Sequence, residues 1–391
     1  MARRQKLLIA AAAAAALLLI AGGLVAAVWV GSDAAPRQRF DAQTLHPAAG
    51  NFEPNDTKLT DCGSDRACIE QAFGNLAFYE GPKNAIRLFD EKIRTDPAIE
   101  SNCHRIAHTI GSASLARFEG NVGTAFVNGS SSCWSGYYHG ILERAFVGAS
   151  TKGEVANVAR GVCQEQDVRA TTWLAYQCVH GLGHGLMITS SYDLPFSLSV
   201  CDRLATPWDQ VSCTGGVFME NISSSYGIES RWLRDDNLVY PCNTVAERHK
   251  QYCYLMVTSR ILQENGYDWA AAVRICRGVE RGWVATCFES YGRDASGFTR
   301  QTPSKILPLC RFAGNYEGRC VYAAARDMTA NYGNGRRASK LCLRAPADLR
   351  ERCFYGIGTI LETQAQGATC RALSKRYAAA CLRGTKERFE A

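Results

Sequence analysis

The apolar residues of this chain follow two different patterns, and the first is a continuous run. Residues 7–30 include no charged residue and, at about 1.5 Å per residue in a helix, are enough to span a ~30 Å hydrocarbon core. Arg3, Arg4 and Lys6 precede this run, and positive charge favours the cytoplasmic side. Cleavage near residues 32–35 is the alternative to a retained anchor. We therefore expect two segments here, a cytoplasmic tip at residues 1–6 and a transmembrane signal-anchor at residues 7–30.

The second pattern is a helical spacing of apolar residues, and it begins after a polar segment. Residues 31–60 are rich in Pro, Ala and Asp and show no apolar periodicity, which predicts a flexible linker. Residues 61–391 alternate between two short amphipathic helices and a turn. In residues 268–295, for example, we expect one helix to end near Cys276 and the next to begin near Trp283.

Cysteines mark a repeat of this two-helix unit. Seven pairs recur, and their second members advance by 35, 40, 34, 33, 33 and 28 residues. In four units a glycine lies three residues after the second cysteine, where a small residue lets neighbouring helices approach closely. These glycines are Gly181, Gly216, Gly356 and Gly384. The predicted pairs are Cys163 with Cys178, Cys201 with Cys213, Cys242 with Cys253, Cys276 with Cys287, Cys310 with Cys320, Cys342 with Cys353, and Cys370 with Cys381.

A helix–turn–helix period of ~34 residues is typical of an α-solenoid. The sequence therefore predicts an all-α, disulfide-stapled αα-hairpin solenoid of about eight or nine repeats behind the transmembrane helix. This organisation resembles the solenoids of the tetratricopeptide and Sel-type class in its period, its hairpins and its cross-hairpin cysteines. The resemblance implies a fold and no activity, because the tetratricopeptide signature aromatics are missing. Residues 225–245 break the repeat as an insertion loop, between a half at about 97–224 and the repeats at about 245–391.

Composition indicates the cellular compartment of the protein and excludes nucleic acid as a binding partner. The formal net charge of +7 includes three cations of the N-terminal segment, and acidic residues are mixed throughout the rest. Such a surface lacks the basic stripe that nucleic-acid binding needs. Eighteen cysteines, an even number, favour disulfides in an oxidising compartment. Cys62, Cys68, Cys103 and Cys133 lie outside the seven pairs and allow three connectivities, of which we favour 62–68 with 103–133.

Histidines supply the candidate chemistry. Five of the seven fall within 81 residues, on three successive second helices, and two of these helices carry a pair at positions i and i+4. Neighbouring helices pack about 8–10 Å apart, so imidazoles in register can meet at one metal ion. The predicted metal ligands are His104, His108, His139, His180 and His184.

Two glutamates continue this register. Glu143 lies one turn after His139, and Glu220 lies on the next helix, so either could be a further ligand or a catalytic general base. Imidazole-rich ligation suits copper, zinc or iron, and five histidines favour one or two ions. The alternative is that the histidines are structural core residues and the glutamates lie on a solvated helix face.

Arg260, Arg293 and Arg326 occupy the same register on later helices. They could line the same concave face and bind a small anionic substrate through a carboxylate or phosphate group. The alternative is an ordinary solvated cationic face.

Together these features predict a single-pass membrane protein with most of its chain extracytoplasmic. We expect a metal-dependent enzyme, either an oxidoreductase at copper or iron or a zinc-assisted hydrolase. The competing interpretation is a non-catalytic metal-binding or protein-binding solenoid, whose concave face docks a partner protein. The chain contains no HExxH, GxSxG, GK[ST] glycine loop or CxxCH motif that would name a more specific activity.

Overall fold

The computed structural model describes residues 50–225, 227–332, 334–363 and 369–386. Within these residues every regular element is an α-helix or a short 3-10 helix, which confirms the all-α prediction. None of the helices described is both long and apolar enough to cross a bilayer. The predicted cytoplasmic tip and signal-anchor, and residues 31–49 of the predicted linker, lie outside the described residues.

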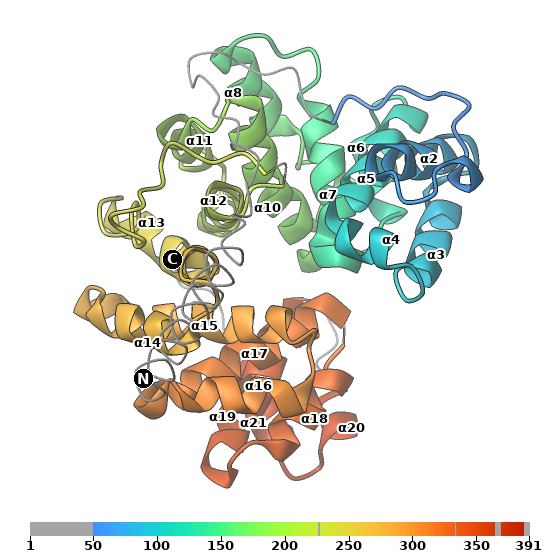
Figure 1. The fold of residues 1–391 in the computed structure, drawn as a ribbon. Helices are drawn as coiled ribbons and strands as arrows, with labels where there is room; N and C mark the ends of the chain where they lie inside the picture. Colours follow the sequence, from blue (N-terminus) through green and yellow to red (C-terminus); the bar gives the residue numbers. More distant parts are fainter. Residues whose placement is uncertain (1–49, 226, 333, 364–368, 387–391) are drawn as a thin grey trace, which may run out of the picture. The chain divides into compact units, whose positions relative to one another are not determined.

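Ten of the described helices follow one another as a row in which each packs against the next (Figure 1). We call them the B helices. They are α2 (Arg66–Tyr79), α5 (Cys103–Arg117), α7 (Ser132–Ala145), α10 (Thr172–Thr189), α12 (Pro207–Ile222), α13 (Glu247–Glu264), α15 (Val284–Phe298), α17 (Glu317–Tyr332), α19 (Arg350–Thr363) and α21 (Ala378–Gly384).

Shorter helices connect most B helices and complete the two-helix units. They are α3 (Pro82–Lys92), α4 (Pro97–Ser101), α6 (Val122–Val127), α8 (Lys152–Gly161), α9 (Gln166–Arg169), α11 (Leu194–Cys201), α14 (Trp269–Gly278), α16 (Pro303–Arg311), α18 (Arg336–Arg344) and α20 (Cys370–Leu373). The unit around Cys276 matches its prediction, since α14 ends at Gly278 and α15 begins at Val284 after a 3-10 turn at Arg281–Trp283. The predicted insertion loop is also confirmed, because residues 223–246 contain no helix among those described.

All nine predicted disulfides join their expected partners. Outside the repeat, Cys62 is bonded to Cys68 and Cys103 to Cys133, which confirms the favoured connectivity. The seven repeat disulfides join Cys163 to Cys178, Cys201 to Cys213, Cys242 to Cys253, Cys276 to Cys287, Cys310 to Cys320, Cys342 to Cys353, and Cys370 to Cys381.

Each repeat disulfide closes a short loop. The sequence separation of the paired cysteines is between 10 and 15 residues, and each bond fastens a B helix to the segment before it. Closing a loop of this length removes about 3 kcal/mol of chain entropy from the unfolded state. The disulfides therefore stabilise units whose individual cores are small.

Part of the predicted linker belongs to the packed body. The side chain of Phe52 is 6% exposed, and its backbone carbonyl accepts a hydrogen bond from Arg144 of α7 at 2.8 Å. Its backbone N–H donates to the hydroxyl of Ser112 on α5. The packed domain thus begins before residue 61, because an isolated phenylalanine in a polar segment finds an apolar site between these helices.

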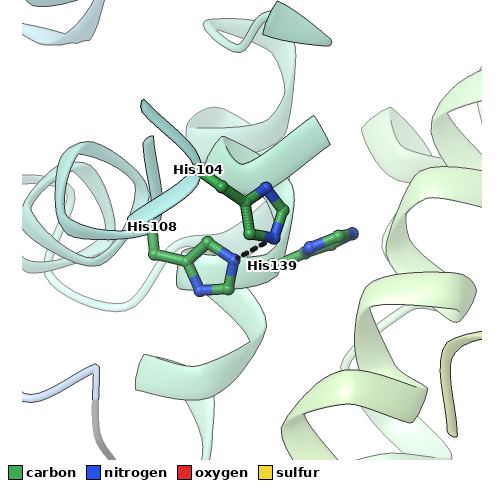
Figure 2. Close-up of side chains that lie close together, drawn as sticks. All are labelled: His104, His108 and His139. Atoms are coloured by element: carbon green, nitrogen blue, oxygen red, sulfur yellow. Dashed lines mark hydrogen bonds between the residues drawn. The ribbon is translucent and has the colours of Figure 1, made fainter. Parts of the chain in front are cut away.

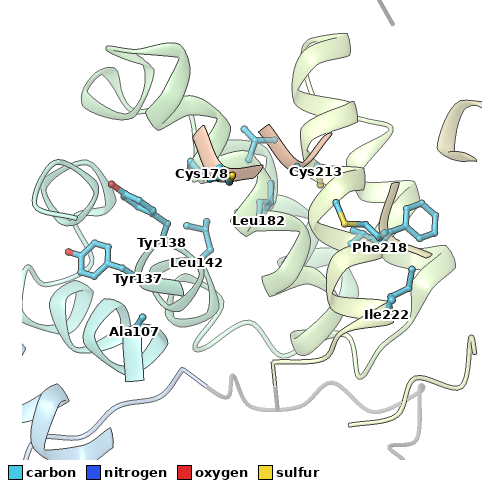
Figure 3. Close-up of a cluster of buried hydrophobic side chains, with 14 of the residues drawn as sticks. Ala107, Tyr137, Tyr138, Leu142, Cys178, Leu182, Cys213, Phe218 and Ile222 are labelled. Carbon is cyan, nitrogen blue, oxygen red and sulfur yellow. The ribbon is translucent and has the colours of Figure 1, made fainter. Parts of the chain in front are cut away.

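The core runs between the B helices. Figure 3 shows buried apolar side chains from α5, α7, α10 and α12, among them Ala107, Leu142, Leu182 and Phe218. The same four helices carry the candidate histidines and glutamates, so the apolar packing fixes the positions of these polar residues.

Glycines let the B helices approach to backbone contact. A Cβ atom added at Gly216 would overlap the carbonyl of His180, and one added at Gly384 would overlap the carbonyl of Tyr355. Gly292 of α15 has the same relation to the carbonyl of Cys320 on α17. The predicted role of a small residue three positions after the second cysteine is therefore confirmed at Gly216 and Gly384, whereas Gly292 lies five residues after Cys287 and was not predicted.

Gly292→Ala should destabilise the domain by roughly 1–3 kcal/mol, because the new methyl group meets backbone that cannot move aside. Gly297→Ala, in the same helix, is the matched control, since a Cβ there meets no atom within 4 Å. It should be neutral or stabilising by up to ~1 kcal/mol. Denaturant unfolding of both variants checks this, and equal stabilities would contradict the close-packing explanation.

Candidate metal centre

Five histidines from three neighbouring B helices meet inside the domain. Figure 2 shows His104 and His108 of α5 facing His139 of α7. His180 and His184 of α10 lie on the other side of His139, with ring centroids 5.8 and 4.0 Å from its centroid. Four of the five side chains are buried, and His104 is half-buried. The predicted register is confirmed in the sense that these helices bring all five rings together.

The rings form two groups of three that share His139. The first group is His104, His108 and His139, and the second is His139, His180 and His184. In each group one ligand nitrogen per ring can be chosen so that all three lie within 4.8 Å of one another. Each group could therefore hold a metal ion, since three imidazoles are a common protein ligand set for one.

Glycines make this meeting possible. A Cβ atom at Gly140 of α7 would overlap the backbone carbonyl of His108, and one at Gly136 would come within 2.7 Å of the carbonyl of His104. The helices α5 and α7 thus touch through their backbones beside the histidines. Side chains as short as imidazole can then reach one another across the contact.

Three of the rings are oriented by hydrogen bonds at Nδ1. Nδ1 of His104 lies 2.8 Å from the carbonyl oxygen of Cys133, and Nδ1 of His108 lies 2.6 Å from Oε1 of Glu143. Nδ1 of His184 lies 2.9 Å from Oε2 of Glu220. A neutral imidazole that donates from Nδ1 keeps the lone pair on Nε2. Nε2 of His104 and Nε2 of His108 lie within hydrogen-bond distance of each other at 3.0 Å, and Nε2 of His184 is buried without a hydrogen-bond partner among the described residues.

Several other ring nitrogens are buried without a hydrogen-bond partner in the described part of the chain. Both nitrogens of His139 are in this state, as are Nδ1 of His180 and Nε2 of His184. A buried polar group that lacks a partner costs about 1–3 kcal/mol. A cluster of such atoms on neighbouring rings is the arrangement expected of ligands for a metal ion.

The interior keeps the rings uncharged. Burial is the largest cause that lowers the pKa of His104 to about 3, and the neighbouring His108 lowers it further. Burial likewise lowers the pKa of His180 to about 3, which the backbone of Ser212 offsets only in part. It also holds the pKa of His139 well below its usual value. These three imidazoles are therefore neutral near pH 7, which is the form that binds metal.

The two predicted catalytic glutamates contact histidines. Glu143 and Glu220 are fully buried, and each carboxylate meets Nδ1 of a histidine on the preceding B helix. Burial raises the pKa of Glu220, but hydrogen bonds from His184, Ser225 and Tyr192 outweigh burial and lower it to about 2. Glu220 is thus an anion at neutral pH, placed to orient and polarise the imidazole of His184.

Tyr192 and Ser225 were not among the candidate residues. The hydroxyl of Tyr192 donates to Oε1 of Glu220 at 2.6 Å, while the backbone N–H and hydroxyl of Ser225 also donate to this carboxylate. Tyr192 follows α10, and Ser225 lies in the insertion loop. Neither belongs to the helical register on which the prediction rested, so no sequence signal pointed to them.

The first turn of α7 has an unusual backbone. Cys133, Trp134 and Ser135 have positive φ angles of 49°, 54° and 63°. Such conformations cost non-glycine residues of the order of 1–3 kcal/mol each and persist where surrounding contacts enforce them. Here the disulfide from Cys103 and the hydrogen bond to His104 hold the carbonyl of Cys133 in place.

The three candidate arginines do not form a free cationic face. Arg260 is 2% exposed and pairs with Asp235 at 2.7 Å and Glu264 at 3.3 Å. Arg293 pairs with Asp294 at 3.0 Å and also donates to Ser259 and Met256. Arg326 lies over the ring of Tyr322, 5.4 Å from its centroid.

These pairings bear on the anion-binding hypothesis. Arg260 already forms ion pairs with the carboxylates of Asp235 and Glu264. Arg293 lies close enough to the histidine cluster for its charge to lower the pKa of His180 slightly, after burial and His184. Anion binding by these arginines stays a prediction.

Comparison of the chain with protein-family models, curated proteins and solved structures returned no match.

Acid should destabilise the metal-free protein from an unusually high pH. His104 and His180 have a pKa of about 3 when folded and about 6.5 when unfolded, so below pH 6.5 the unfolded chain binds protons that the folded chain does not. The free energy of unfolding should fall between pH 6.5 and 5 by up to about 1.4 kcal/mol per pH unit for each such histidine. Denaturant unfolding across this range measures the slope.

A His180→Gln variant is the comparison for this slope. It removes one of the depressed histidines, so its unfolding free energy should depend less steeply on pH over the same interval. A flat profile for the unsubstituted protein from pH 6.5 to 5 would show that the rings are not held neutral.

Proposed function

We propose that this protein is a metalloprotein whose five buried histidines hold one or two transition-metal ions. The observation that supports it best is His139, whose two ring nitrogens are both buried without a hydrogen-bond partner between two pairs of histidines. A structural imidazole in a protein core donates from one nitrogen and accepts at the other. A metal ion accounts for ring nitrogens that none of the described residues satisfies.

The alternative of purely structural histidines fits only part of the cluster. His108 and His184 each have a carboxylate partner, as a structural histidine would. Carboxylate–histidine pairs of this kind are also what orients metal-bound imidazoles, so they fit both interpretations. Both nitrogens of His139, Nδ1 of His180 and Nε2 of His184 have no hydrogen-bond partner among the described residues, which favours the metal interpretation.

Ligand chemistry and charge narrow the choice of ion. All cysteines of the described residues are in disulfides, so no thiolate is offered. Imidazole ligation suits copper, zinc and iron, and the general order of affinities favours copper over zinc. Glu143 and Glu220, one behind each group of histidines, could offset the charge of one divalent or two monovalent ions, which lowers the cost of burying cations.

The surroundings of the site bear on what the ion would do. His108, His139 and His184 are at most 2% exposed, so a large substrate does not reach their nitrogens in this conformation. Burial favours redox chemistry at copper or iron over zinc-assisted hydrolysis, because electrons can enter through the protein whereas a hydrolysed bond must reach the metal-bound water. The same burial equally suits a second candidate function, that of a non-catalytic module that retains metal.

Nine disulfides support function in an oxidising compartment. We propose that residues 7–30 anchor the protein in a membrane with the helical domain on the extracytoplasmic side, as the sequence of that segment predicts.

Metal should copurify with the full chain and depend on the cluster. The protein, purified from an oxidising compartment without chelators, should carry at least one equivalent of metal by mass spectrometry of the elements. His184→Ala should lower this content measurably, because it removes a ligand from the second group of histidines. His249→Ala is the matched control, since His249 lies in α13 and bonds Asp202 outside the cluster. Absence of metal, or full metal content in the His184 variant, would refute the proposal.

The glutamate behind His184 should tune affinity without being a ligand. Glu220→Gln should weaken metal binding by about 10–100-fold, the usual effect of removing such a partner. Glu280→Gln is a control, because Glu280 also accepts a hydrogen bond from a tyrosine but lies far along the chain in a surface pair with Lys250. Competition with a chelator of known affinity measures both variants. Unchanged affinity in Glu220→Gln would mean that the carboxylate does not support the site.

A further inference from the structure

We infer that the centre is dinuclear, with the imidazole of His139 bridging two metal ions. One ion would take His104 and His108, and the other would take His180 and His184. This inference rests on the proposed metal-binding function and specifies how many ions the site holds and through which atoms.

The first pair of histidines is already aimed at a common point. Nε2 of His104 and Nε2 of His108 lie 3.0 Å apart. Two ligand nitrogens on one tetrahedral ion are separated by roughly 3.3 Å, given metal–nitrogen distances near 2.0–2.1 Å. Both rings use Nδ1 elsewhere, His104 with the carbonyl of Cys133 and His108 with Glu143. An ion at this pair would bind Nε2 of each ring in place of their mutual hydrogen bond.

The second pair offers an equivalent set from α10. His180 and His184 lie one helical turn apart, with ring centroids 5.2 Å from each other. Nε2 of His184 and Nδ1 of His180 are buried and have no hydrogen-bond partner, whereas Nδ1 of His184 is held by Glu220. This pair therefore presents at least one nitrogen, Nε2 of His184, that the described residues leave unsatisfied.

His139 stands between the pairs. Its ring centroid lies 5.4 and 5.3 Å from those of His104 and His108, and 5.8 and 4.0 Å from those of His180 and His184. Neither nitrogen of this ring has a hydrogen-bond partner among the described residues, and its plane lies 19° from that of His184, so bridging requires the ring to turn until one nitrogen faces each side. The two nitrogens of one imidazole then place two ions roughly 6 Å apart.

A single ion does not satisfy this arrangement. If one ion bound the first group of three, the buried nitrogens of His180 and His184 would stay without hydrogen-bond partners among the described residues. Two ions satisfy all five rings. When the second nitrogen of His139 binds, its proton leaves for solvent, and the bridging ring carries a negative charge between the two cations.

The test is the stoichiometry and magnetic coupling of Cu²⁺ added to the metal-free full chain in detergent. The unsubstituted protein should bind two equivalents after removal of loose copper. Its electron paramagnetic resonance signal at liquid-helium temperature should account for far fewer spins than copper atoms, because an imidazole bridge couples the two ions. The double variants H104A/H108A and H180A/H184A should each retain one equivalent, with spin count equal to copper content.

The outcomes separate this inference from the function on which it rests. Binding of no copper in the cluster would refute the proposed function itself. One equivalent in the unsubstituted protein, lost in both double variants, would keep the metal site but overturn the dinuclear assignment. Two equivalents with a full spin count, or with unchanged affinity and spectrum in His139→Gln, would overturn the bridge. Circular dichroism and intact disulfides would establish that each variant is folded.

Discussion

The close approach of neighbouring B helices is the constraint on which the rest of this structure depends. Glycines bring helix backbones into contact at Gly140 and Gly216, and disulfides fasten B helices to the segments before them. Side chains on adjacent helices then meet in register along the row. Without that approach, imidazoles on adjacent helices would lie too far apart to bind the same metal ion. The cost of glycine in a helix, ~1 kcal/mol relative to alanine, is offset by this packing.

The candidate metal centre arises from polar groups placed in such a packed interior. Burial keeps His104, His139 and His180 neutral, while the hydrogen bonds of His184, Tyr192 and Ser225 keep Glu220 charged. The uncharged imidazoles therefore lie near at least one anion, the carboxylate of Glu220, which favours binding of a cation between the rings. The backbone carbonyl of Cys133 lies 2.8 Å from Nδ1 of His104 and orients that ring, and the disulfide to Cys103 holds Cys133 in place. Disulfides thereby contribute to the site as well as to stability.

Much of the fold followed from the sequence because it depends on local spacing. The cysteine pairs, the turn between Gly278 and Val284 and the loop at 223–246 all reflect contacts close along the chain. The histidine register followed as well, since equal steps along packed helices keep side chains level. The hydrogen-bond partners of those histidines could not be predicted from the sequence. A glutamate could bind a metal ion or orient a histidine, depending on the offset between two adjacent helices along their axes. Spacing along the sequence does not determine this offset to within one turn. Tyr192 and the pairing of Arg260 with Asp235 depend on loops that follow no repeat.

The most direct test of the central claim is anomalous X-ray diffraction from crystals of the metal-loaded protein at the absorption edge of the bound metal. We predict peaks inside the histidine cluster, on either side of the His139 ring, about 2.0–2.1 Å from the nitrogens of His108 and His184. Peaks confined to the protein surface, or no peak within reach of these rings, would contradict the account.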